Sequence, residues 1–119
     1  MPGAPAPRAA VEGFLSAVRA QDLQAMSNVW GSSKGPARDI ITDRAELEKR
    51  ELVMQCYLDH DRFQILGDMA GEKGGRVFRV ELTKGDLIRT TSFTTVKGPS
   101  DRWYVLEADL TPVKDLCGR

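Results

Sequence analysis

Residues 54–69, with the sequence MQCYLDHDRFQILGDM, contain the point at which the spacing of apolar residues changes along the chain. Before Asp61 apolar side chains recur at helical spacing, and after it they alternate as they do in a strand. Short turns separate the strands predicted downstream, so neighbouring strands are expected to be antiparallel. The sequence therefore predicts an α+β fold, in which helices from the first half pack against a sheet from the second.

Three helices are predicted upstream of Asp61. The first covers residues 7–20, and the second follows Asp22, which has the character of an N-cap. The third runs from Asp43 to Leu58, because Asp43 and Glu46 have the spacing of a capping box. We expect this third helix to be the most buried, with its charge-rich residues 44–51 facing solvent. Residues 31–36 are predicted to be a loop and residues 39–41 a brief strand.

Four strands are predicted downstream, over residues 62–69, 76–83, 87–96 and 102–110. The clearest alternation lies in the second of these strands, where Phe78, Val80 and Leu82 share one face. Glycine-rich or Gly-containing turns separate the strands, as in an antiparallel meander.

Length and charge limit the classes of function. The chain has 119 residues, enough for one domain, which we place at residues 8–119 after a flexible linker at residues 1–7. Its 17 basic and 17 acidic side chains are interspersed, so no broad positive field is available to bind nucleic acid. No apolar run approaches the roughly 20 residues of a transmembrane helix.

Two cysteines, Cys56 and Cys117, stand alone in their regions of the chain, and this spacing excludes a zinc site. They either form a disulfide or remain independent thiols, and we favour the disulfide. A disulfide favours an extracytoplasmic location, periplasmic or lipid-anchored, over a cytoplasmic one. The N-terminus has no signal-peptide pattern, so the chain starts either naturally in the cytoplasm or after a removed signal segment.

The order of elements carries a resemblance. The helix with Leu47 to Leu58 precedes the sheet, and a strand near the end of the chain carries the pair Trp103-Tyr104. From about Arg8 to Leu110 the chain resembles the NTF2-like superfamily, a cystatin-like α+β roll, and in particular its uncharacterised bacterial members of secreted or lipoprotein type. The resemblance implies a strongly bent sheet around the long helix, a conical pocket, and a homodimer formed through the outer sheet face. No functional residue transfers by motif.

Four residues are candidates for lining such a pocket: Trp30, Tyr57, His60 and Arg89. His60 is the single histidine, and its carboxylate neighbours in Asp59-His60-Asp61 suggest acid–base chemistry, although a turn at the helix end explains them better. Arg89 would anchor an anionic ligand if its strand face turns inward, and would lie in water otherwise. The aromatic side chains would suit a small apolar ligand, or would simply belong to the core.

Two classes of function follow, and no cofactor or metal is predicted for either. The preferred class is a non-enzymatic binding or accessory domain that uses its conical pocket for a small molecule or its sheet face for a protein partner. The alternative is a small lyase, isomerase or hydrolase with an Asp, His or Tyr general acid–base in the pocket. The identity of any catalytic residue stays unknown at this point.

Overall fold

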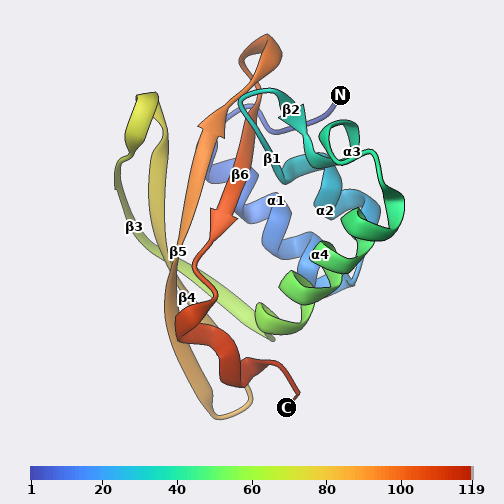
Figure 1. Cartoon of the computed structure of the whole chain (residues 1–119). Coiled ribbons are helices and arrows are strands. Elements are labelled where there is room, and N and C mark those ends of the chain that lie inside the picture. The colour runs from blue at the N-terminus through green and yellow to red at the C-terminus, as the bar shows by residue number, and fades with distance from the viewer. Residues whose placement is uncertain (119) are drawn as a thin grey trace.

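The protein is an α+β domain, as predicted, described for residues 1–118 by a computed structural model. Figure 1 shows the helices gathered on one side of a twisted antiparallel sheet, whose strand order is β3-β4-β5-β6. The helices are α1 (Pro7–Ala20), α2 (Leu23–Val29), α3 (Ala37–Ile40) and α4 (Arg44–Tyr57). The sheet strands are β3 (Arg62–Ala70), β4 (Arg76–Lys84), β5 (Leu87–Lys97) and β6 (Trp103–Ala108). A small hairpin is formed by β1 (Gly31–Ser32) and β2 (Gly35–Pro36). The remaining elements are the 3-10 helices η1 (Glu72–Gly74), η2 (Pro99–Asp101) and η3 (Thr111–Leu116).

The predicted helix starts are confirmed by their caps. The Asp22 carboxylate accepts a hydrogen bond from the Ala25 N–H at 3.0 Å. The Asp43 carboxylate accepts two, from Ala45 at 3.0 Å and Glu46 at 3.2 Å. These bonds satisfy N–H groups that the first helical turn cannot pair internally, which is why α2 and α4 begin where they do.

The core lies between α1 and the inner face of the sheet. Phe14 of α1 meets Phe93 of β5 edge to face, with ring centroids 6.2 Å apart. Phe78, Val80 and Leu82 of β4 share one face, as predicted, and the structure shows that this face points to the core. From η3, Val113 and Leu116 are also buried in it. Side chains therefore fill the space between α1 and the sheet, which is one part of the region where the resemblance placed a conical pocket.

Helix α4 is less buried than predicted. Its Leu52 and Val53 side chains are 46% and 44% exposed, whereas α1 buries six residues. The reason is position, because α1 lies against the sheet while α4 lies beside it and packs on the core through Leu47, Met54 and Tyr57. The prediction that α4 is the most buried helix was therefore wrong.

Smaller differences concern short elements. The strand expected at residues 39–41 is wrong, since residues 37–40 form α3, and the loop expected at residues 31–36 contains the β1–β2 hairpin. The last strand ends at Ala108, and residues 111–116 turn into η3. Register shifts between Ile65 and Gly67 and between Thr94 and Thr95 interrupt the ladders, and such bulges bend a sheet.

Residues 2–4, which the sequence assigned to a linker, are hydrogen bonded to the rest of the domain. Ala4 is buried and exchanges two backbone hydrogen bonds with Trp103, at 2.8 and 2.9 Å. The Arg102 guanidinium donates to the carbonyls of Pro2 and Gly3. Gly3 has a φ of +76°, and a Cβ there would lie 2.9 Å from the ring of Tyr104, so only glycine fits.

Candidate functional site

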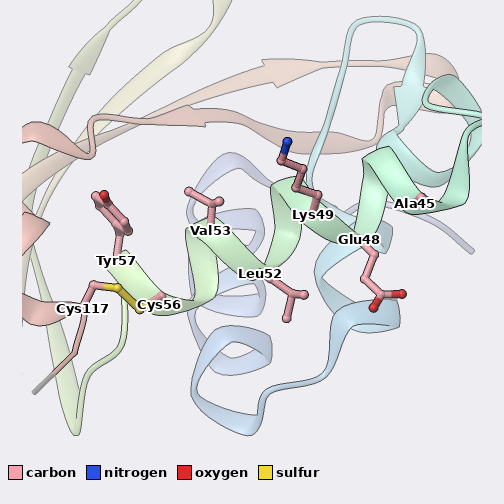
Figure 2. Close-up of a pocket in the computed structure, with 8 residues that line it drawn as sticks. All are labelled: Ala45, Glu48, Lys49, Leu52, Val53, Cys56, Tyr57 and Cys117. Carbon is pink, nitrogen blue, oxygen red and sulfur yellow. A yellow bond between two sulfur atoms is a disulfide. The ribbon is translucent and has the colours of Figure 1, made fainter.

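A disulfide joins Cys56, in the last turn of α4, to Cys117, just after η3, with 4.7 Å between their Cα atoms. The predicted pairing is thus confirmed. Figure 2 shows the bridge at one end of α4, where it fixes the C-terminal segment beside the helix. The bridge ties down a segment that already buries Val113 and Leu116.

Three adjoining hollows follow the exposed side of α4. The first, about 610 Å³, is open and shallow and is lined by Ala45, Glu48, Lys49, Leu52, Val53, Cys56, Tyr57 and Cys117. Figure 2 shows its residues, with Val53 and Lys49 on one side of the helix and Leu52 and Glu48 on the other. The second, about 290 Å³, lies between α4 and β6 and is lined by Trp30, Glu46, Lys49, Arg50, Val53, Met54, Leu106, Glu107, Ala108 and Leu110. The third, about 150 Å³, is lined by Trp30, Gly31, Ser32, Ala37, Ile40, Ile41, Arg50 and Leu106.

Exposed apolar side chains connect these hollows. Val53 lines the first and second, Leu106 lines the second and third, and Ile40 lies in the third. Together with Leu52, these side chains are between 41% and 46% exposed. We call Ile40, Leu52, Val53 and Leu106 the α4 surface. Large apolar side chains exposed singly are normal, but neighbours from three elements that share hollows are typical of binding surfaces.

Two of the four predicted pocket residues border this surface. Trp30 forms the floor of the second and third hollows, and the Arg50 guanidinium lies 5.0 Å above its ring in a cation–π contact. Tyr57 borders the first hollow, beside the disulfide. The sequence analysis named these two aromatic residues, but not the exposed aliphatic residues Leu52 and Val53 that also line the hollows.

His60 lies apart from these hollows, inside the protein. Its side chain is 3% exposed, and its ring lies edge to face against Phe63, with centroids 5.7 Å apart. Nδ1 is 2.9 Å from the carbonyl oxygen of Leu58, so Nδ1 carries the proton and donates, which leaves Nε2 as a buried acceptor without a partner. Burial lowers the pKa of His60, because the charged imidazolium would lose its hydration.

The two carboxylates beside His60 hold the β4–β5 turn. Asp59 forms an ion pair with Lys84 at 2.7 Å, and Asp61 accepts a hydrogen bond from the Gly85 N–H at 2.7 Å. Both carboxylates therefore have partners within the chain, which agrees with the turn interpretation of Asp59-His60-Asp61.

Arg89 lies on the inner face of β5, in register with Leu82, but at the end of the strand. Its guanidinium forms a forked ion pair with the carboxylate of Asp115 in η3. The pair ties η3 to the sheet. The carboxylate of Asp115 therefore accepts the guanidinium hydrogen bonds that Arg89 would have donated to an anionic ligand.

A second kind of hollow lies between α2, α3 and α4. It measures about 390 Å³, and we call it the Glu51 hollow; its lining residues are Leu23, Gln24, Ser27, Arg38, Arg44, Leu47, Glu48 and Glu51. The Glu51 side chain is 3% exposed, and its Oε2 atom is buried without a hydrogen-bond partner. Burial, helped by the charge of Glu48, raises the pKa of Glu51 from 4.5 to about 7.

The sequence prediction missed Glu51 and placed it on a solvated face. A pattern that could have identified it was present, since Glu51 continues the apolar stripe of Leu47, Met54 and Leu58 at helical spacing. A single carboxylate on such a stripe must be buried if the stripe is. Buried carboxylates with raised pKa values are more frequent at functional sites than elsewhere.

Neither the structure nor the comparisons identify a family or a cofactor. Among residues 1–118, no group of three or more His, Cys, Asp and Glu side chains is arranged to hold a metal ion. The described helices include none that is both long and apolar enough to cross a lipid bilayer. No protein-family model, curated protein or solved structure matches the chain.

Proposed function

We propose that this protein is a non-enzymatic binding domain of the NTF2-like kind, which holds an apolar segment of a protein partner against the α4 surface. One observation carries the proposal: Ile40, Val53 and Leu106, from three different elements, are exposed around adjoining hollows, and Leu52 extends the first of these hollows on the other side of α4. Burying such side chains on association yields about 25 cal/mol for each Å² of apolar area. Leaving them in water has no evident benefit for the fold.

The charges around this surface suit a peptide more than a lipid-like molecule. Lys49 and Arg50 lie beside Glu46 and Glu107 on the rim of the second hollow, so both signs are available to partner side chains. An apolar centre with a mixed polar rim is the usual anatomy of a protein–protein interface. The element order that motivates the NTF2-like assignment is present in the fold, with helices before a four-stranded meander.

The filled core argues for binding rather than catalysis inside the roll. Phe14, Phe78 and Phe93 occupy the space between α1 and the sheet, and His60 is buried away from the hollows of α4. A lyase, isomerase or hydrolase of this fold would need an open cavity that admits its substrate to an acid or base.

Site-directed photo-crosslinking in the organism that encodes the chain tests the proposal. A benzoylphenylalanine placed at position 53 is expected to capture one discrete protein, whereas the same residue at Glu12, exposed on α1, is expected to capture none. A third position, Arg79 on the outer sheet face, reports the alternative interface. Equal capture at positions 53 and 12, or none at position 53, would refute binding at the α4 surface.

We also propose that two copies associate through the outer face of the sheet, as the resemblance suggests. The helices leave this face uncovered (Figure 1), and it carries Thr90, Thr94 and the 56% exposed Ile88. Capture of a second copy from position 79 would support the dimer. A monomeric mass at high concentration in sedimentation equilibrium would contradict it.

An extracytoplasmic location is part of the same proposal. The Cys56–Cys117 disulfide supports it, because structural disulfides persist in oxidising compartments and are rare in the cytosol. Alkylation of intact cells before reduction gives the test. Both cysteines should resist the reagent until a reductant is added, and rapid labelling of both would favour the cytoplasm.

A further inference from the structure

The Glu51 hollow lies on the side of α4 opposite Val53. Residues 51 and 53 are two apart on α4, and side chains so spaced project about 200° apart around a helix. The hollow is the more enclosed of the two regions, and its volume of about 390 Å³ lies within the range of small-molecule sites. It shares Glu48 with the first hollow of the α4 surface and otherwise has its own lining residues, so the inference drawn from it does not rest on the partner-binding proposal.

The floor of this hollow is polar and unsatisfied. Glu51 Oε2 is buried without a hydrogen-bond partner, although an unpaired buried acceptor costs about 1–3 kcal/mol. The neighbouring buried hydroxyl of Ser27 donates to the Gln24 carbonyl of its own helix and so leaves Glu51 without that donor. Native proteins satisfy nearly all buried polar atoms, so a donor from outside the chain is the natural complement of this carboxyl group.

The exposed charged residues that line the hollow are two arginines and one carboxylate, Glu48. Arg38 of α3 and Arg44 of α4 are both exposed and both line it, and neither belongs to an ion pair with Glu51 in the described part of the chain. Guanidinium groups bind carboxylates through paired N–H donors. Between the acidic floor and the basic rim, Leu23 and Leu47 supply apolar walls.

We propose that the Glu51 hollow binds a small zwitterion, a free amino acid with an apolar side chain. Its ammonium group donates to the Glu51 carboxylate, its carboxylate reaches the guanidinium groups of Arg38 and Arg44, and its side chain contacts Leu23 and Leu47. A simple anion would meet the buried carboxylate, and a simple amine would bring no carboxylate to the two arginines. Only a ligand with both charges satisfies the floor and the rim together.

The protonation of Glu51 makes such binding depend on pH. Burial raises the pKa of Glu51 to about 7, so the free carboxyl group holds a proton below neutrality and must lose it to accept an ammonium donor. The other charged groups that line the hollow are Glu48 and Arg44 of α4 and Arg38 of α3, while α2 contributes no titratable side chain. Affinity is therefore expected to increase as the pH rises through 7.

Nuclear magnetic resonance titrations with three related compounds test the proposal. L-leucine has both charges, isopentylamine lacks the carboxylate, and 4-methylpentanoate lacks the ammonium group. L-leucine is expected to shift the amide signals of Ser27 and Glu51 with a Kd in the millimolar range, about −4 kcal/mol. Each single-charge analogue is expected to bind about tenfold more weakly, a loss of about 1.4 kcal/mol.

Variants identify which residue binds each charged group of the ligand. Glu51→Gln, which keeps the shape of the side chain, should lose discrimination between L-leucine and 4-methylpentanoate, and Arg44→Gln should lose discrimination against isopentylamine. Glu72→Gln, an exposed change in η1, should bind as the parent protein does. The proposal is overturned if the three compounds bind equally, if Glu51→Gln binds L-leucine unchanged, or if shifts are absent or confined to the α4 surface at about 10 mM ligand.

Discussion

Replacing Glu51 by glutamine should stabilise the protein at alkaline pH. The raised pKa, about 7 in the fold against 4.5 for a free side chain, means that the folded protein holds a proton that the unfolded chain has lost. The stability contributed by this carboxyl is present below pH 4.5 and is lost as the pH rises through about 7. At about 1.4 kcal/mol per unit the gap amounts to about 3 kcal/mol, and partial hydration of the ionised group reduces it to about 2–3 kcal/mol.

Urea unfolding under non-reducing conditions measures this difference. Tryptophan fluorescence, to which the buried Trp30 and the partly buried Trp103 both contribute, reports unfolding, and the denaturant midpoint and slope give the free energy at each pH. Glu51→Gln should match the parent protein near pH 4 and exceed its stability by about 2–3 kcal/mol near pH 8. Glu72→Gln makes the same chemical change on an exposed side chain and should differ little from the parent at any pH.

A constant offset between Glu51→Gln and the parent, independent of pH, would show that Glu51 ionises normally in the fold. A Glu51→Gln variant that is less stable than the parent protein at pH 8 would contradict the raised pKa of Glu51. It would mean that the charged carboxylate has a favourable partner, contrary to the buried Oε2 described above.

Three further outcomes are expected. Replacing both Cys56 and Cys117 by serine should lower the free energy of unfolding by about 2–4 kcal/mol, since the bridge closes a loop of 61 residues; calorimetry with an unchanged melting temperature would contradict this. His60→Gln should lose less stability than the parent protein as the pH drops below 6.5, because the buried His60 resists protonation in the fold while the unfolded chain is protonated. Urea titrations in which both proteins lose the same free energy of unfolding at acidic pH would contradict this. Val53→Lys should leave stability within about 0.5 kcal/mol and reduce the fluorescence of an apolar dye; equal dye binding would argue against the α4 surface.

The local rules in the sequence predicted most elements. Asp22 and Asp43 were recognised as caps because their short carboxylates suit the first helical turn, and they do cap α2 and α4. The alternation in residues 76–83 grouped Phe78, Val80 and Leu82 correctly on one face of the strand, because side chains alternate between the two faces; that this face is the inner one came from the structure. These patterns depend on neighbours along the chain, which a single sequence contains.

Properties set by packing between distant elements were harder to predict. Whether α1 or α4 lies against the sheet depends on tertiary arrangement, and both have apolar residues at helical spacing. Arg89 occupies the inner face, but its partner Asp115 comes from η3, an element that the sequence did not predict. The apolar stripe on which Glu51 lies indicates a buried face, but the sequence does not say that α2 is the element that covers it.

The disulfide also divides the chain into two covalent parts. Every strand of the main sheet lies between Cys56 and Cys117, so the sheet belongs to a closed ring, while α1, α2, α3 and most of α4 form a linear arm. One proteolytic cut within the ring leaves the protein in a single covalent piece, whereas one cut before Cys56 releases a fragment. Strand pairing therefore occurs inside a ring that cannot lose a segment to a single cut, and the helical arm is the part that a protease can remove.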